Sequence, residues 1–182
     1  MKRFSAMFAI LIAIHFTFAM QNPAYDFNAC IKPYAYKEVK KSFIDYIMQH
    51  EGYSDTVYLC PSNYKTIGYG HRVLKGEVFS RLTKKQAKEL LEKDFSKALR
   101  YARLDNLPKE YELPVAHFIY CLGVGNYQKS TFRSYLRSGN VRQACVELRK
   151  WVYVNGRKNQ NLIKQRNFEA KALKQAYPYT KK

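Results

Sequence analysis

The sequence predicts an α+β fold, in which a long helix joins a small antiparallel β lobe to a larger helical lobe. Three observations lead to this prediction. The segment 53–71 is short, rich in aromatic residues and interrupted by glycines. Apolar residues recur at helical spacing on both sides of it, and a helix-capping signal follows it. The length of 182 residues suits one domain, and contents of 47% hydrophobic and 25% charged residues are typical of a globular chain.

The N-terminus predicts export. Lys2 and Arg3 precede an uncharged run, residues 4–25, whose most apolar stretch is residues 8–14. This order is typical of a secretory signal, so residues 1–19 are expected to be a signal peptide cleaved after Ala19, or an uncleaved signal anchor. A linker or arm is expected over 20–35, the folded domain over 36–176 and a tail over 177–182.

The first half of the domain is predicted to be a helix followed by a hairpin. Val39, Phe43, Tyr46 and Ile47 share one helical face, and that helix is expected to end at residues 51–52, because Gly52 can take the left-handed conformation. The turn signal over residues 61–63 separates two strand-like runs, which predicts a small antiparallel hairpin sheet.

Everything after the sheet is predicted to be helical. Thr83 and Gln86 form a capping box that begins the long connecting helix. Pro108 interrupts the pattern, and further helices are expected over 115–122 after Pro114, over 131–136, from 141 to 151, and over 159–176.

The net charge of +18 predicts attraction to an anionic partner. Nucleic acid, a membrane face and a cell-wall polymer would all satisfy this condition. Because export is expected, we exclude nucleic acid and favour cell-wall polymers, with membrane contact only through the N-terminal segment. We expect an exported monomer, either secreted or periplasmic.

Four cysteines, Cys30, Cys60, Cys121 and Cys145, allow three disulfide pairings, among which the sequence does not choose. The chain has no C-x-x-C or C-x-x-H spacing, so no structural zinc site is expected. No other metal and no cofactor is expected either.

Glu51, Cys60 and Thr66 are separated by eight and then five residues, and Thr66 begins the segment Thr-Ile-Gly-Tyr-Gly-His. This arrangement resembles the phage-type lysozymes of glycoside hydrolase family 24, whose motif is Glu, then Asp or Cys, then Thr at these spacings. The resemblance extends through residues 122–132, which look like the family's Gly-rich turn. It then follows a C-terminal pattern that includes Trp151, Arg166 and Glu169, and covers residues 36–176.

The resemblance implies a lysozyme-like fold with a cleft between the lobes. It also implies hydrolysis of the β-1,4 bond between N-acetylmuramic acid and N-acetylglucosamine in peptidoglycan. Glu51 would be the general acid, and Cys60 with Thr66 would activate water or attack the anomeric carbon. Such an acid must stay protonated, so burial must raise its pKa against the many surrounding cations. Cys60 replaces the Asp of many relatives, which leaves a retaining or inverting outcome open.

Other residues take secondary roles from the same resemblance. Tyr120 and Thr131 would contact the saccharide. His71 is expected to be structural, paired with an acidic residue of the next lobe. Arg166 and Glu169 are expected to support the fold.

Three alternatives stay open. Cys60 could form a structural disulfide, or a disulfide released by thiol exchange as in some exported relatives, with Cys30 as the preferred partner. The chain could be a catalytically silent, cationic wall- or membrane-binding protein on the same scaffold. Cys60 and His71 could instead serve an amidase or peptidase. The biological setting, whether phage lysis, wall remodelling, competitor killing or defence, is left open by the sequence.

Overall fold

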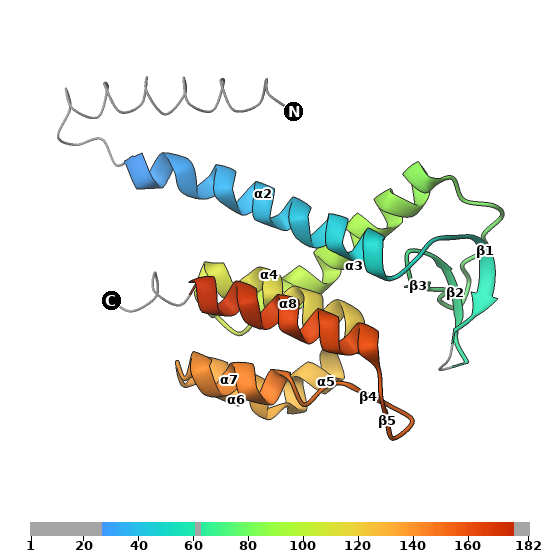
Figure 1. The fold of residues 1–182 in the computed structure, drawn as a ribbon. Helices are drawn as coiled ribbons and strands as arrows, with labels where there is room; N and C mark the ends of the chain where they lie inside the picture. The colour runs from blue at the N-terminus through green and yellow to red at the C-terminus, as the bar shows by residue number, and fades with distance from the viewer. Residues whose placement is uncertain (1–26, 61–62, 177–182) are drawn as a thin grey trace. The chain divides into compact units, whose positions relative to one another are not determined.

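The computed structural model describes residues 27–60 and 63–176 (Figure 1). The predicted signal segment, residues 20–26 of the predicted linker and the tail lie outside them. The chain divides into two compact units, Met1–Lys40 and Lys41–Lys182. Within the described residues, no helix is both long enough and apolar enough to cross a membrane.

Helix α2, Phe27–His50, corrects the prediction of a linker over residues 20–35, because residues 27–35 are helical. Two prolines suggested irregular chain, but α2 also contains four lysines and two alanines, which favour a helix. The end of α2 agrees with the prediction. The Glu51 N–H donates to the Ile47 carbonyl at 2.9 Å, and Gly52 takes a φ of +75°.

The predicted small sheet is confirmed. Strands β1 (Ser54–Leu59), β2 (Lys65–Gly68) and β3 (His71–Arg72) form an antiparallel sheet in the order β1-β2-β3. The pairing of β1 with β2 is irregular between Ser54 and Tyr58. This sheet is the β lobe, and it positions both Cys60 and Thr66.

Helix α3, Lys84–Arg103, is the predicted connector. Its capping box is complete, because Thr83 Oγ1 accepts from the Gln86 N–H at 3.3 Å and Gln86 Oε1 accepts from the Thr83 N–H at 2.9 Å. The helix contacts β2 and β3 and packs on α4 (Figure 1). A Cβ at Gly68 would lie 3.3 Å from the Ala87 Cβ, so this glycine lets the sheet approach the helix closely.

The helical lobe consists of α4 (Lys109–Leu122), α5 (Val124–Lys129), α6 (Thr131–Arg137), α7 (Val141–Leu148) and α8 (Gln160–Ala176). Its core is α4, whose Val115, Ala116 and Phe118 are fully buried. The helix contacts α3, α5 and α8, and α7 packs on both α6 and α8.

Helix α4 begins before Pro114, not after it as predicted. Glu110 and Glu112 stabilise its first turn through the helix dipole, and Pro114 in the second turn removes only one backbone hydrogen bond. The Gly-rich segment after α4 was expected to be a turn, but Val124–Lys129 is helical, anchored by the buried Tyr127.

Residues 149–158 are not helical, which corrects the prediction of helix throughout. Helix α7 ends at Leu148, before Trp151, and β4 (Tyr153–Val154) pairs with β5 (Arg157–Lys158). Asn155 and Gly156 have φ values of 49° and 75°. Positive φ at both central residues is the geometry of a tight hairpin turn that Asn-Gly favours.

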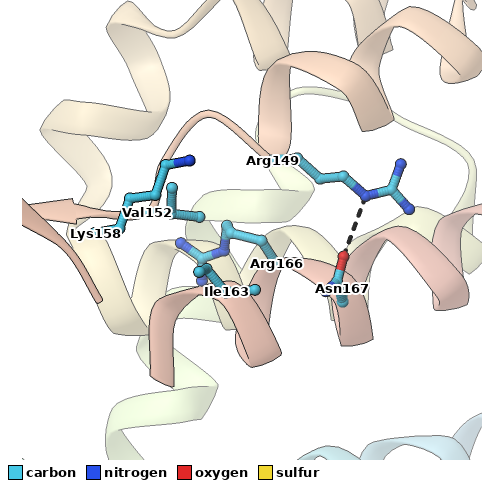
Figure 2. A pocket seen from close by; sticks show the side chains of 6 residues that line it. All are labelled: Arg149, Val152, Lys158, Ile163, Arg166 and Asn167. Atoms are coloured by element: carbon cyan, nitrogen blue, oxygen red, sulfur yellow. Dashed lines mark hydrogen bonds between the residues drawn. The ribbon is translucent and has the colours of Figure 1, made fainter. Parts of the chain in front are cut away.

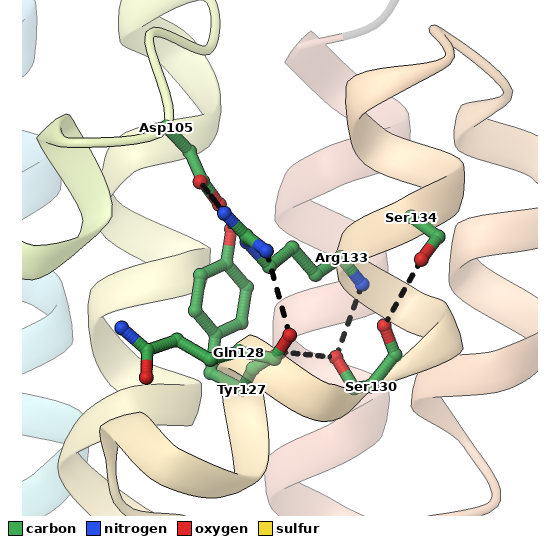
Figure 3. Close-up of polar contacts among 6 residues, drawn as sticks. All are labelled: Asp105, Tyr127, Gln128, Ser130, Arg133 and Ser134. Carbon is green, nitrogen blue, oxygen red and sulfur yellow. Dashed lines mark hydrogen bonds and ion pairs between the residues drawn. The ribbon is translucent and has the colours of Figure 1, made fainter.

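A polar network ties the α3–α4 loop to α5 and α6 (Figure 3). The Asp105 carboxylate accepts from Arg133 Nη2 at 2.5 Å, from Arg133 Nε at 2.8 Å and from the Tyr127 hydroxyl at 2.6 Å. Ser130 caps α6, because its Oγ accepts from the Arg133 N–H at 3.1 Å. Burial raises the pKa of Asp105, but the Arg133 and Tyr127 hydrogen bonds outweigh it and hold the pKa below its usual value.

Candidate active site

Glu51 lies directly after α2, in a pocket of about 240 Å³. The β lobe contributes Gly70 to the lining, and the helical lobe contributes most of the rest: Tyr120, Cys121, Val154, Asn159, Asn161, Leu162 and Gln165. The pocket therefore lies between the two lobes, where the sequence predicted a cleft, and both predicted residues Glu51 and Tyr120 line it.

The Glu51 carboxyl group is held by residues distant in the sequence. Gln165 Nε2, on α8, donates to Glu51 Oε1 at 2.5 Å. A Cβ at Gly70, whose φ is +95°, would lie 4.0 Å from Glu51 Oε2 and 3.6 Å from the Tyr120 hydroxyl oxygen. That hydroxyl donates to the Tyr69 carbonyl at 2.7 Å, which fixes the ring of Tyr120 beside the acid.

Burial raises the pKa of Glu51 above its usual value of 4.5. The residue as a whole is exposed, but its carboxyl group lies among enough protein atoms to be desolvated. The His117 cation, the Gln165 hydrogen bond and the Arg166 cation act in the opposite direction and only reduce the shift. Burial therefore outweighs the local cations, which is the condition that a general acid must meet.

A buried ion-pair cluster lies near Glu51. His117 on α4 and Arg166 and Glu169 on α8 are all fully buried. Glu169 Oε1 lies 2.5 Å from His117 Nδ1 and 2.7 Å from Arg166 Nη2. Burial disfavours the imidazolium, but Cys121 and Glu169 outweigh it and raise the pKa of His117 to about 10. The cluster joins α4 to α8, as expected for Arg166 and Glu169 in support of the fold.

His117, Cys121 and Glu169 also place possible metal-ligand atoms within 4.8 Å of one another, and no other such group occurs in the described part of the chain. Arg166 pairs with the same Glu169 oxygen. Because its guanidinium already neutralises the carboxylate, we interpret this group as an ion-pair cluster.

Cys60 and Thr66 lie in the β lobe and do not line the Glu51 pocket. The half-buried Cys60 follows β1, and its N–H donates to the Tyr64 carbonyl at 3.0 Å. Thr66 on β2 is buried, and its hydroxyl donates to the same carbonyl at 3.0 Å. Tyr58 links this part of the site to the acid, because burial and then the negative charges of Cys60 and Glu51 raise the pKa of its phenol.

No disulfide joins any two of Cys60, Cys121 and Cys145 in the described chain. Cys145 is buried on α7, where burial raises its pKa. The preferred pairing of Cys60 with Cys30 involves a side chain outside the described residues, so it remains a prediction.

Thr131 is not part of the pocket that holds Glu51 and Tyr120. It is the exposed first residue of α6, and its hydroxyl donates to Glu147 Oε2 at 2.9 Å. Its proposed contact with saccharide therefore gains no support from this pocket.

His71 is structural, as predicted. It is buried on β3, with Nδ1 at 2.5 Å from Asp94 Oδ2 on α3 and Nε2 at 2.9 Å from Glu77 Oε2. Burial lowers its pKa, but the Asp94 and Glu77 hydrogen bonds outweigh this and raise it overall. Since carboxylates engage both ring nitrogens, neither is available as a base for Cys60, and this argues against the amidase or peptidase alternative.

A second pocket, of about 200 Å³, lies on another face of α8 (Figure 2). Its lining is basic and apolar: Arg149, Val152, Lys158, Ile163, Arg166 and Asn167. Arg149 Nε donates to Asn167 Oδ1 at 3.2 Å. The pocket contains none of the predicted catalytic residues, so the Glu51 pocket is the candidate active site.

Two residues of this site were missed by the sequence reasoning, Gln165 and His117. A glutamine on an amphipathic helix carries no motif of its own. The i, i+4 spacing of His117 and Cys121 on a predicted helix could have drawn attention to His117, because this spacing places both side chains on one face of the helix.

Comparison with known proteins identifies relatives. The SAR-endolysin of Enterobacteria phage PA-2 is 31% identical over 111 residues, covering 57% of this chain and 65% of that protein. The SAR-endolysin of Bacteriophage PS119 is 30% identical over 111 residues, covering 57% of this chain and 64% of that protein. The chain thus spans just under two thirds of the length of these relatives.

Solved structures share the fold. The muramidase domain of SpmX from Asticaccaulis excentricus has a TM-score of 0.63 and 21% identity, covering 72% of this chain and 94% of that chain. The active form of the P1 phage endolysin Lyz has a TM-score of 0.62 and 18% identity, covering 94% of this chain and 96% of that chain. These similarities confirm the predicted lysozyme-like α+β fold. The phage lysozyme family model matches residues 48–169, a span of more than half the sequence, and the chain therefore belongs to the phage lysozyme family.

Proposed function

We propose that this protein is a peptidoglycan-degrading muramidase that hydrolyses the β-1,4 bond between N-acetylmuramic acid and N-acetylglucosamine. The observation that carries the proposal is the Glu51 carboxyl group, which lies in a pocket between the two lobes with its pKa raised by burial. A protonated carboxyl at such a position can give its proton to the leaving glycosidic oxygen. Membership of the phage lysozyme family supports the same reaction.

Cys60 and Thr66 are the proposed partners of Glu51 on the sheet side of the site. The Thr66 hydroxyl donates to the Tyr64 carbonyl, which leaves its oxygen able to accept a hydrogen bond from a water or a sugar hydroxyl. A Cys60 thiolate would stabilise the positive charge that develops at the anomeric carbon, or would attack it. Tyr120 lines the pocket beside the acid and offers aromatic surface to a sugar ring.

The substrate fits the charge of the protein. A net charge of +18 favours adsorption to anionic wall polymers, with an encounter rate that falls as salt screens the attraction. We further propose export, as a secreted or periplasmic protein, on the basis of the basic and apolar N-terminus and of relatives that are named SAR-endolysins.

The test is the release of new reducing sugar ends from purified peptidoglycan under reducing conditions. Glu51→Gln should lower the rate on the order of 10²–10⁴-fold, because general acid catalysis contributes that much. Glu89→Gln is the matched control, since it makes the same charge change at an exposed position on α3. If the wild type and Glu51→Gln bind walls equally and the wild type releases no reducing ends, a silent wall-binding protein is supported instead. New free amines would support an amidase or peptidase.

A further inference from the structure

Gln165 is buried to an extent that is unusual for its residue type. Its side chain is 4% exposed, and it lines the Glu51 pocket from α8. The amide nitrogen donates to Glu51 Oε1 at 2.5 Å. The amide oxygen is buried and has no hydrogen-bond partner among the described residues. An unsatisfied buried acceptor costs about 1–3 kcal/mol, so this oxygen calls for an explanation.

The chemistry of a general acid supplies one. Glu51 must alternate between a carboxylic acid, which has an O–H donor, and a carboxylate, which only accepts. A primary amide carries both a donor and an acceptor on one planar group, and its terminal torsion is broad and roughly two-fold. A half turn of the Gln165 amide would place its oxygen where its nitrogen now lies. That oxygen has no other hydrogen bond to lose.

The surrounding charges make a neutral partner important. His117 and Arg166 already favour the Glu51 carboxylate through their positive charges. A lysine or arginine at position 165 would add another cation beside the acid, and a glutamate would add a like charge. An amide adds neither, so it can contact both forms of Glu51 without strongly favouring either one.

We propose that Gln165 is a positioning residue that holds the Glu51 carboxyl group in one orientation in both of its protonation states. It donates to the carboxylate and, after a half turn of its amide, accepts from the acid. The inference rests on the proposed role of Glu51 as general acid.

The test compares Gln165→Met, which keeps the length but cannot hydrogen-bond, and Gln165→Lys, which donates only. Gln160→Met, exposed on the same helix, is the matched control. Turnover of solubilised peptidoglycan is measured from pH 4 to pH 9, and kcat and KM are separated. We expect Gln165→Met to lower kcat about 10- to 100-fold with KM within about twofold, since misplacement of a reacting group by about 1 Å can cost 10²-fold. Gln165→Lys should move the alkaline limb of the kcat profile to lower pH.

A second readout does not depend on activity. The Glu51 side-chain carboxyl is titrated by ¹³C NMR in glutamate-labelled protein, with near-UV circular dichroism to confirm folding. Gln165→Met should titrate close to the wild type, because it removes a partner from both forms of Glu51, whereas Gln165→Lys should titrate at lower pH, because a cation favours the carboxylate. A Gln165→Met titration well above that of the wild type would show that Gln165 only donates to the carboxylate, and would overturn the inference. If Gln165→Met does not fold, Gln165→Asn, whose amide is one methylene too short, takes its place. A wild type that titrates as expected but releases no reducing ends would refute the proposed function and leave the coupling of Gln165 to Glu51 established.

Discussion

The Asp105 network offers the sharpest test of the energetics of the helical lobe. The Asp105 side chain is 6% exposed and that of Arg133 is 27% exposed, and the carboxylate accepts hydrogen bonds from both Arg133 and Tyr127. Removing one partner of a buried ion pair costs about 3–5 kcal/mol. Because solvent screens the partly exposed Arg133, we expect Asp105→Ala to lose about 3 kcal/mol, the lower end of that range.

The assays are urea unfolding and thermal melting at neutral pH, with Asp105→Ala, Arg133→Met and the double variant as a cycle. In a domain of this size, 1 kcal/mol corresponds to about 2–4 °C in Tm, so Asp105→Ala should unfold roughly 6–12 °C below the wild type. Tyr127→Phe removes only the hydroxyl and should cost less. The two single losses should sum to more than the loss of the double variant, because they remove one shared interaction.

The pH dependence follows from the lowered pKa of Asp105. A carboxyl whose pKa is lower in the folded state contributes stability above its unfolded pKa, which is 3.8, and loses that stability as pH falls through the folded pKa. The difference between wild type and Asp105→Ala should therefore shrink below about pH 4. A difference under about 1 kcal/mol at neutral pH, or one independent of pH, would show that the network does not stabilise the lobe as a buried ion pair does.

Three further predictions concern the site and the β lobe. Because the pKa of Glu51 is raised above 4.5 and the protonated form is the proposed acid, kcat should fall as pH rises through that pKa, and a profile that rises instead would exclude Glu51 as the acid. Cys60→Asp should stay active and should resist the thiol alkylation that inhibits the wild type, whereas Cys60→Ala should lose activity. The control is Cys145→Ala, at a buried cysteine on α7. Full activity of Cys60→Ala would show that the sulfur takes no part in the mechanism. His71 has a pKa raised above 6.5 by Asp94 and Glu77, so its stabilising contribution should be complete below pH 6.5 and lost as pH rises through the folded pKa, and urea unfolding of His71→Gln should differ from the wild type more at pH 6 than at pH 9.

Local signals predicted much of the fold. The Thr83 capping box and the hairpin before it act over a few residues, and their outcome depends little on the rest of the chain. The errors arose where a local signal was overridden or overlooked. Pro114 was expected to begin a helix, but burial of α4 in the core carries the helix through it. The Asn155-Gly156 dipeptide is a strong hairpin signal that the helical pattern around it obscured.

By itself, the sequence determined the α+β class, the positive charge and a motif that singled out Glu51, and it anticipated that His71 would be paired with an acidic residue of the next lobe. Only the tertiary structure decided what surrounds the acid, because Glu51 and Gln165 are 114 positions apart and meet through the packing of α8 beside the end of α2. Composition likewise could not decide whether burial would raise the pKa of Glu51 more than nearby cations lower it. Desolvation depends on the positions of all neighbouring atoms, and these exist only once the two lobes enclose the pocket.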